Sequence, residues 1–181
     1  MAKVNTDGIV LLVDDEESIR EALGDLLEAC GYTTYKADCY KSAVKELSAH
    51  PDIETVICDL KMPGESGLEV LKHINEKGYN IPLIFLTGFG TLESCQEAVK
   101  EGAFDYILKP IDNKDRIIYP LNHAIEKKRL EAKTAELQRE IISMAEEHQA
   151  ILDELLVDAE MKDKVQAKIS KVLDKWDTKR K

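Results

Sequence analysis

Short apolar runs alternate with amphipathic stretches along roughly the first 112 residues of the chain. Each run is about five residues long and rich in Ile, Val, Leu or Tyr, and several lack polar alternation. Runs of this kind are typical of strands that are buried on both faces of a parallel sheet. The predicted strands are Ile9–Val13, Thr33–Ala37, Glu54–Cys58, Leu83–Leu86 and Tyr106–Leu108.

Helical patterns separate these runs. In the first pattern Ile19, Leu23 and Leu27 fall on one face, which is the spacing of an amphipathic helix. The predicted helices are Glu17–Cys30, Tyr40–Ala49, Gly67–Lys77 and Leu92–Glu101. Three of them are followed by a glycine that can end a helix, namely Gly31, Gly78 and Gly102.

This alternation of strands and helices predicts an α/β fold. Right-handed strand–helix–strand units would build a five-stranded, doubly wound parallel sheet with helices on both sides. In such sheets the functional groups gather at the carboxyl ends of the strands. We therefore look for candidate functional residues at those ends.

The pattern changes after Lys109-Pro110. Pro120 is the last proline, no glycine or proline follows it, and the remaining chain is dense in the good helix formers Glu, Lys, Ala, Leu and Gln. A continuous helix over this part would reach ~90 Å at ~1.5 Å per residue. The expected organisation is one α/β domain over residues 7–128 and a helical, coiled-coil tail over residues 129–181.

A heptad-like apolar seam follows this tail. Its members are Leu130, Leu137, Ile141, Met144, Ile151, Leu155, Val165, Ile169, Val172 and Trp176, and four polar residues interrupt it: Thr134, His148, Asp158 and Lys162. Because a long polar helix is not stable alone, we expect the seam to be buried against a partner helix. A parallel dimeric coiled coil is the first choice, and a helical hairpin that turns near Val157–Asp163 is the alternative.

Composition and charge restrict the class of protein. The chain of 181 residues is 44% hydrophobic and 33% charged, and no stretch approaches the ~18 apolar residues of a membrane helix. No signal peptide is recognisable, so a cytoplasmic location is expected. The net charge of -10 argues against general nucleic-acid affinity, although residues 162–181 carry seven Lys and one Arg against three Asp. We interpret that basic end as a solvated helix end.

Four cysteines are scattered without metal-binding spacing, and we interpret them as packing residues. They are Cys30, Cys39, Cys58 and Cys95.

Polar residues of complementary chemistry stand at the ends of four predicted strands. Asp14 and Asp15 follow the first strand, Asp59 ends the third, Thr87 ends the fourth, and Lys109 follows the fifth. Close carboxylates repel one another unless a cation neutralises them, and oxygen ligands of this kind suit Mg²⁺. Asp59 can then act as a carboxylate nucleophile that forms an aspartyl phosphate, with Lys109 and the metal offsetting charge.

The chain also resembles a known family, the receiver domains of bacterial two-component response regulators. The motifs that carry the resemblance are Val-Asp-Asp-Glu at 13–16, Cys-Asp-Leu-Lys-Met-Pro-Gly at 58–64 with Gly67 following, Leu-Thr-Gly at 86–88, and Gly-Ala-Phe-Asp-Tyr-Ile-Leu-Lys-Pro at 102–110. They occur in order and at suitable spacing over about residues 7–128. The receiver part and the start of the tail are similar in particular to those of enhancer-binding regulators.

This resemblance implies a flavodoxin-like receiver fold and a role for each site residue. Asp59 would be the phosphoacceptor, with a histidine kinase or phosphotransfer protein as the donor. Mg²⁺ would be bound by Asp14, Asp15, Asp59 and the backbone carbonyl of Lys61. Lys109 and Thr87 would contact the phosphoryl group, and Thr87 with Tyr106 would form the switch pair.

Three neighbours of the site are expected to set the lifetime of the phosphorylated state. Gly88 leaves room for the phosphodonor, whereas Lys61 and Phe89 would flank the phosphoryl group. The ring of Phe89 should hinder attacking water, so slow self-dephosphorylation is expected.

The predicted function is a phosphorylation-switched signalling protein in a phosphorelay. Phosphorylation would change the face formed by the fourth helix, fifth strand and fifth helix, and with it a homodimer through the C-terminal helix or binding of an unknown downstream protein. The alternative is a coiled-coil adaptor that uses the receiver fold as a docking block, with phosphorylation incidental.

Other classes of function fit the sequence poorly. We do not expect an enzyme, because neither a Ser-His-Asp order nor a Rossmann glycine pattern is present, and we interpret His148 as an ordinary helix residue. Direct DNA binding is not expected either, because the chain shows no phosphate-binding G-x-x-x-x-G-K-[ST] loop and no helix-turn-helix signature. The cognate kinase, the process controlled, and the direction in which phosphorylation shifts dimerisation remain open at this point.

Overall fold

The computed structural model describes residues 7–88 and 100–177, with side chains described for only part of residues 155–177. The chain divides into two compact units, Met1–Glu131 and Ala132–Lys181, which we describe separately. The first unit contains the sheet, and the second consists of the later turns of the last helix.

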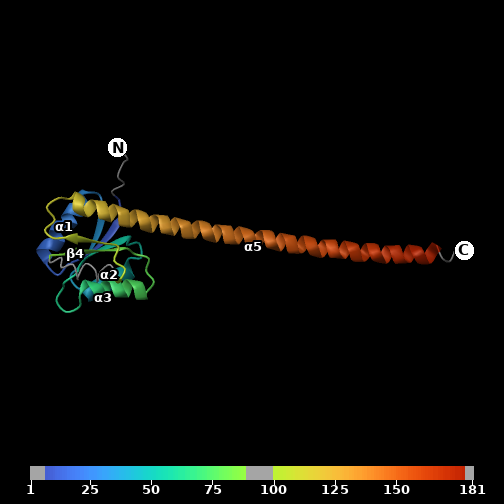
Figure 1. The fold of residues 1–181 in the computed structure, drawn as a ribbon, viewed down its shortest axis with the longest axis horizontal. Helices are drawn as coiled ribbons and strands as arrows, with labels where there is room; N and C mark the ends of the chain where they lie inside the picture. The colour runs from blue at the N-terminus through green and yellow to red at the C-terminus, as the bar shows by residue number, and fades with distance from the viewer. Residues whose placement is uncertain (1–6, 89–99, 178–181) are drawn as a thin grey trace. The chain divides into compact units, whose positions relative to one another are not determined.

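The elements follow one another in the order that the sequence predicts (Figure 1). The strands are β1 (Ile9–Val13), β2 (Thr33–Ala37), β3 (Thr55–Asp59), β4 (Leu83–Thr87) and β5 (Asp105–Leu108). The helices are α1 (Glu17–Ala29), α2 (Tyr40–Ala49), α3 (Gly67–Glu76) and α5 (Asp115–Asp177). The helix expected over Leu92–Glu101 falls mainly outside the described residues.

All five strands pair in parallel, in the order β2-β1-β3-β4-β5. The predicted five-stranded parallel sheet is therefore confirmed. Its order changes direction at β1, where β2 lies on one side and β3 on the other. In a sheet of this kind the crevice at the carboxyl ends of the strands next to that point is the usual place of a functional site.

Side chains that alternate along the strands build two cores, one on each face of the sheet. Leu11 of β1 faces α2 and α3, whereas its neighbours Val10 and Leu12 face α1 and the first turns of α5. Figure 1 accordingly shows α3 and the start of α5 on opposite sides of the sheet. Because β1, β3 and β4 are covered on both faces, their central residues are apolar in succession rather than alternating with polar ones.

Strand bounds differ from the sequence-based expectation by one residue at both ends of β3, at the end of β4 and at the start of β5. Asp59 pairs in register with Leu86, so it belongs to β3 rather than following it, and Leu60 N–H donates to the Leu86 carbonyl at 2.9 Å. Glu54, expected as a strand residue, instead precedes β3, and its carboxylate accepts a hydrogen bond from Ile9 N–H at 3.2 Å.

Glu54 also helps to attach α5 to the amino-terminal edge of the sheet. The Arg129 guanidinium donates to both carboxylate oxygens of Glu54, at 2.6 and 2.9 Å, and to the carboxylate and carbonyl of Asp7. Lys128 donates to the Ile53 carbonyl. We call Arg129, Glu54 and Asp7 the basal clamp.

The second unit is helical along its described length. Helix α5 continues through Val157–Asp163 to Asp177, so the chain does not form the hairpin that was one of the two alternatives for the tail. Large apolar side chains are exposed on the helix after residue 129, and those described are Leu130, Leu137, Ile141, Ile142, Met144, Ile151, Leu152 and Met161. Among the residues that the structure describes, no helix has the length and apolar character needed to cross a membrane.

Candidate functional site

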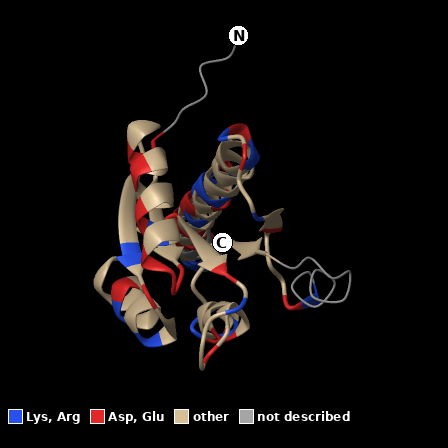
Figure 2. Cartoon of the chain, turned by 90° about the vertical axis from the view of Figure 1, so that its left-hand side faces the viewer, with Lys and Arg blue, Asp and Glu red and all other residues tan. Residues whose placement is uncertain are grey.

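The carboxyl ends of the strands bring the predicted site residues to one edge of the sheet. Asp14 follows β1, Asp59 ends β3, Thr87 ends β4 and Lys109 follows β5. Figure 2 views this edge, where acidic residues surround the strand tips. Asp14, Asp59 and Thr87 are all buried, with exposed fractions of 0%, 7% and 2%. Burying two carboxylates is costly unless their charge is compensated.

Lys109 provides that compensation. Its Nζ donates to Asp14 Oδ2 at 2.7 Å and to Asp59 Oδ2 at 2.8 Å, so one ammonium joins two carboxylates. Burial acts to lower the pKa of Lys109, but its hydrogen bonds and charge interactions with Asp14 and Asp59 outweigh burial and raise that pKa. Lys109 is therefore held as a cation between Asp14 and Asp59.

Backbone and side-chain donors orient the two carboxylates further. Glu16 N–H donates to Asp14 Oδ1 at 3.0 Å, and Lys61 N–H donates to Asp59 Oδ1 at 3.2 Å. Arg20, in the first turns of α1, donates from Nη1 to the Asp14 carbonyl at 2.7 Å. The sequence analysis did not identify Arg20, although an Arg six positions after a strand-terminal Asp, on the following helix, is a usable signal.

Asp14, Asp15 and Asp59 form a cluster of oxygen ligands. Each offers a carboxylate oxygen, and the three oxygens lie within 4.8 Å of one another. One Lys109 ammonium offsets only one of the three negative charges, so the cluster retains an excess of negative charge. Hard oxygen donors with uncompensated charge fit Mg²⁺, which binds through a few carboxylates and keeps its remaining ligands as water or phosphate.

Thr87 has an unusual environment for a buried hydroxyl. Its Oγ1 is buried and makes no hydrogen bond to any described residue. A buried hydroxyl without a partner costs about 1–3 kcal/mol and therefore calls for an explanation. A ligand oxygen that arrives between Thr87 and Asp59 would provide the missing acceptor.

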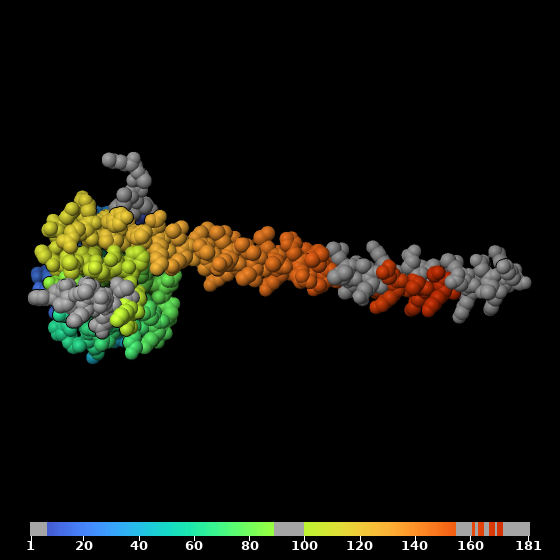
Figure 3. Space-filling view, in the orientation of Figure 1, coloured from blue at the N-terminus to red at the C-terminus, as the bar shows by residue number. Residues whose placement is uncertain are grey.

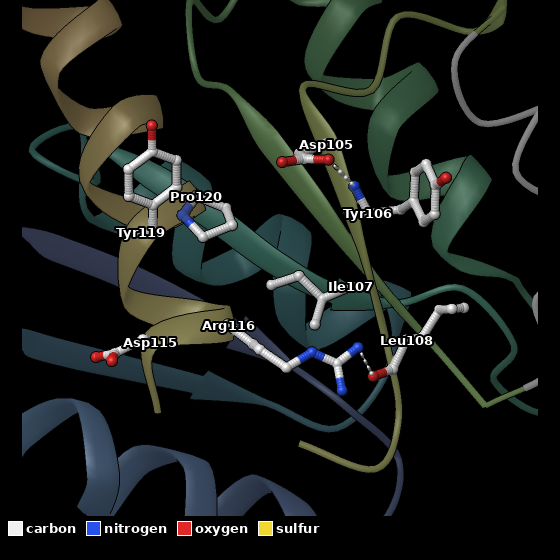
Figure 4. Close-up of a pocket in the computed structure, with 8 residues that line it drawn as sticks. All are labelled: Asp105, Tyr106, Ile107, Leu108, Asp115, Arg116, Tyr119 and Pro120. Atoms are coloured by element: carbon white, nitrogen blue, oxygen red, sulfur yellow. Dashed lines mark hydrogen bonds between the residues drawn. The ribbon is translucent and has the colours of Figure 1, made fainter. Parts of the chain in front are cut away.

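Tyr106 points away from the core. Its side chain is 41% exposed. In the sheet Tyr106 pairs with Phe85 of β4, which lies two residues before Thr87. Figure 4 shows the Tyr106 side chain on the side of β5 that faces away from α5, whereas Arg116 of α5 donates to the Leu108 carbonyl at 3.3 Å. A pocket opens on this face, lined by Asp105, Tyr106, Ile107, Leu108, Asp115, Arg116, Tyr119 and Pro120.

The remaining predicted residues differ in how far the structure describes them. A Cβ added at Gly88 would meet no described atom within 4 Å. Lys61 follows Asp59 by two positions, and its backbone N–H already contacts that carboxylate. Phe89 and Cys95 lie outside the described residues. Of the other cysteines, Cys58 is buried, and Cys30 and Cys39 are half-buried free thiols.

Gly67 brings α3 close to the backbone of Asp59. A Cβ at this position would lie 2.3 Å from the Asp59 carbonyl oxygen and 2.9 Å from Phe85 Cε1. Gly67 N–H also donates to the Leu60 carbonyl at 3.1 Å. Only glycine allows this approach, so Gly67 positions the segment that carries Asp59.

Comparison with known proteins gives a consistent result. The profile of the response regulator receiver domain matches residues 10–119. An NtrX-like response regulator of Rickettsia felis is 36% identical over 139 residues, which is 76% of this chain and 29% of that protein. FixJ, a transcriptional regulatory protein of Azorhizobium caulinodans, is 32% identical over 149 residues, covering 80% of this chain and 69% of FixJ. The chain thus spans less than a third of the length of its first NtrX-like relatives.

Solved structures agree with the sequence relatives. A receiver domain protein from Clostridium thermocellum is 33% identical with a TM-score of 0.64, covering 68% of this chain and 98% of that one. NtrX from Brucella abortus, solved with ADP, is 28% identical with a TM-score of 0.67, covering 72% of this chain and 30% of that one. The chain therefore belongs to the receiver domain family of two-component response regulators.

Proposed function

We propose that Asp59 accepts a phosphoryl group from a histidine kinase or phosphotransfer protein in the cytoplasm. The observation that carries this proposal is the arrangement of Lys109 and Thr87. Lys109 bridges the carboxylates of Asp59 and Asp14, and the buried Thr87 hydroxyl has no hydrogen-bond partner among the described residues. A cation and an unsatisfied donor near one carboxylate suit the three terminal oxygens of an anionic phosphoryl group.

The reaction is a transfer between two nucleophiles. A carboxylate oxygen of Asp59 forms a bond to phosphorus while the bond from phosphorus to the donor breaks, and that electron pair leaves with the donor. Lys109, which now donates to Asp59, would donate to a phosphoryl oxygen, and Thr87 would donate to another. Phosphoryl transfer depends mainly on such positioning and charge compensation.

Mg²⁺ belongs to this proposal as the metal of the acidic cluster. Asp14, Asp15, Asp59 and the backbone carbonyl of Lys61 would hold it, and when bound it supplies positive charge that offsets the phosphoryl oxygens. The excess negative charge of the three clustered carboxylates supports this assignment.

Phosphorylation would then act through Thr87 and Tyr106. A hydrogen bond from Thr87 to the phosphoryl group would draw the end of β4 toward Asp59, and Tyr106 would turn from its exposed position toward the space that Thr87 leaves. Such a change biases an equilibrium between two arrangements of β5 and the start of α5, the face on which the pocket of Figure 4 lies.

We further propose that the tail over residues 129–181 forms a homodimer or binds a downstream protein, and that this output responds to Asp59. The exposed apolar residues of α5 support the proposal, because a helix with such a face needs a partner. We keep the prediction that Lys61, Gly88 and Phe89 tune the lifetime of the phosphorylated state.

Mass spectrometry after incubation with acetyl phosphate and Mg²⁺ tests the phosphorylation. The parent chain should gain one phosphoryl group, and Asp59→Asn should gain none. Asp38→Asn is the matched control, because Asp38 is an exposed acid that follows β2 at the same edge but lies outside the Asp14–Asp15–Asp59 cluster. Equal labelling of Asp59→Asn and the parent would refute the assignment.

If the protein is instead a coiled-coil adaptor, its assembly and partner binding should not depend on Asp59. In that case Asp59→Asn would bind partners and assemble as the parent does, with or without beryllofluoride and Mg²⁺. Molar mass in solution, measured for both proteins in both conditions, separates the two functions.

A further inference from the structure

The tail has an uneven distribution of charge along its length. Residues 132–160 contain eight Asp or Glu and two Lys or Arg, whereas residues 162–181 contain seven Lys and one Arg against three Asp. Helix α5 is continuous from the first segment through the second as far as Asp177, so residues 132–177 form one helix with an acidic half followed by a basic half. The described part of this helix is coloured orange to red in Figure 3.

This polarity bears on how two copies of the tail can pair. In a parallel pair in register, the acidic half of one copy lies along the acidic half of the other, and basic lies along basic. In an antiparallel pair each acidic half lies along a basic half. The seam of apolar residues is compatible with both orientations, because it repeats every seven residues in either direction.

The heptad positions e and g, which flank the apolar seam, offer no ion pairs that would favour a parallel dimer. With Leu137, Met144 and Ile151 at position d, position e is occupied after residue 131 by neutral residues only: Gln138, Ala145, Leu152, Ala159, Gln166 and Leu173. Parallel coiled coils are oriented by ion pairs between positions g and e. The tail cannot form a single such pair in that arrangement.

We infer that two copies of the tail pair antiparallel, centred on Glu160. The inference rests on the homodimer proposed above and specifies its interface. In this register the position numbers of facing seam residues add up to 320, and the helices overlap from about residue 143 to 177, which is about 50 Å at ~1.5 Å per residue.

Described side chains meet suitable partners in this register. Exposed Glu154 flanks the partner's exposed Lys168, and this contact occurs twice by symmetry. Met161, which is 57% exposed, lies beside its own copy at the centre of the pair. By heptad spacing alone, position 151 of one copy would lie opposite position 169 of the other.

Seam spacing alone adds a further argument from two polar positions. Asp158 would face Lys162 of the other copy in the antiparallel register. In a parallel pair Asp158 would face Asp158 and Lys162 would face Lys162, and like charges brought together at a seam oppose association. At these two seam positions the antiparallel dimer thus pairs opposite charges, whereas the parallel dimer pairs like charges.

Charge reversal in the full chain tests the orientation. Glu154→Lys and Lys168→Glu should each weaken self-association roughly threefold to tenfold, since each converts two attractive pairs into repulsive ones. The double variant should recover the parent's dissociation constant, because the pairs are restored with inverted sign. Arg139→Glu lies outside the overlap and serves as control. Additive weakening in the double variant would overturn the antiparallel register.

Disulfide crosslinking gives a second readout that needs no change of charge. A mixture of full-length Ile151→Cys and Ile169→Cys chains should form a disulfide between positions 151 and 169, identified by mass spectrometry, with the parent chain as control for its native cysteines. Neither variant alone should crosslink at its new cysteine. Crosslinking of Ile151→Cys with itself would show a parallel dimer and overturn this inference alone, whereas a monomeric parent chain would overturn the proposed homodimer as well.

Discussion

At the scale of single residues, the candidate site balances three carboxylates against one ammonium. Asp14 is completely buried, and its carboxylate forms an ion pair with the Lys109 ammonium at 2.7 Å. The same ammonium serves Asp59. Loss of one partner from a buried ion pair costs more than the pair contributes, because the charge left behind stays desolvated.

Replacement of Lys109 should therefore destabilise the fold. Without divalent ions, Lys109→Met should lower the free energy of unfolding by about 2–3 kcal/mol, because two buried carboxylates lose their cation. Added Mg²⁺ should restore part of this loss. Urea denaturation with and without Mg²⁺ measures both effects. Lys36→Met, which removes a mostly exposed pair with Glu21, is the control and should cost less than about 1 kcal/mol.

Ionisation of Tyr32 should lower the free energy of unfolding as the pH rises above about 10. Burial raises the pKa of Tyr32 to about 12, and its hydroxyl donates to Asn122 Oδ1 at 2.5 Å. Because the ordinary pKa of tyrosine is about 10, the unfolded chain loses this proton first. The contribution of Tyr32 is complete below pH ~10 and should be lost progressively as the pH rises from ~10 to ~12, at up to ~1.4 kcal/mol per pH unit.

Comparison with Tyr32→Phe isolates this effect from other groups that titrate at high pH. The variant should be less stable than the parent at neutral pH by about 1 kcal/mol, since it lacks the bond to Asn122. Its unfolding free energy should fall less steeply above pH 10. Parallel curves for the two proteins across pH 9–12 would contradict the prediction.

At the scale of elements, each strand end at the site depends on how the neighbouring helix is packed. Helix α3 starts at Gly67, against the carbonyl of Asp59, and α1 carries Arg20 back to the carbonyl of Asp14. The backbone around both carboxylates is thus held by the helices that follow them. Small changes at these contacts should move the carboxylates without touching them.

Gly67→Ala tests this dependence. The added Cβ has no room between the Asp59 carbonyl and Phe85, so α3 or the β3 end must shift, at a cost of about 1–3 kcal/mol. Thermal unfolding should show a lower Tm than the parent. Gly88→Ala is the matched control, because its Cβ would meet no described atom within 4 Å, and its Tm should change far less. Equal shifts for the two variants would show that close packing at Gly67 is not the cause.

At the scale of the whole molecule, one helix belongs to both units. The turns of α5 before residue 131 complete the core and carry the basal clamp, whereas the later turns expose an apolar seam. Assembly and folding should therefore be separable by truncation, provided that the cut spares Arg129.

A chain that ends after Glu131 should fold with nearly the parent's receiver stability and be a monomer by light scattering, whereas the full chain should be a dimer. A chain that ends after Lys128 should also be monomeric but less stable by about 1 kcal/mol, because it loses the bonds of Arg129 to Glu54 and Asp7. A dimeric Glu131 truncation would place the dimer interface outside the tail.

Sequence alone determined the features that depend on local periodicity and order. Continuous apolar runs such as Ile9–Val13 predict buried strands, and residues such as Asp59 and Thr87 are recognisable because they end those runs. The exact limits of β3 were wrong by one residue, since they depend on pairing with β4 rather than on the run itself. The charge polarity of the tail is likewise visible in the sequence.

Only the tertiary structure decided which of these residues meet. Asp14 and Lys109 are 95 positions apart, and their 2.7 Å contact follows from the order of β1, β3, β4 and β5 in the sheet. The bond of Arg20 to the Asp14 carbonyl, and the burial of the Thr87 hydroxyl without a hydrogen-bond partner among the described residues, also depend on how separate elements pack. Periodicity is a property of neighbouring residues, whereas these contacts are properties of the assembled sheet, which no local pattern specifies.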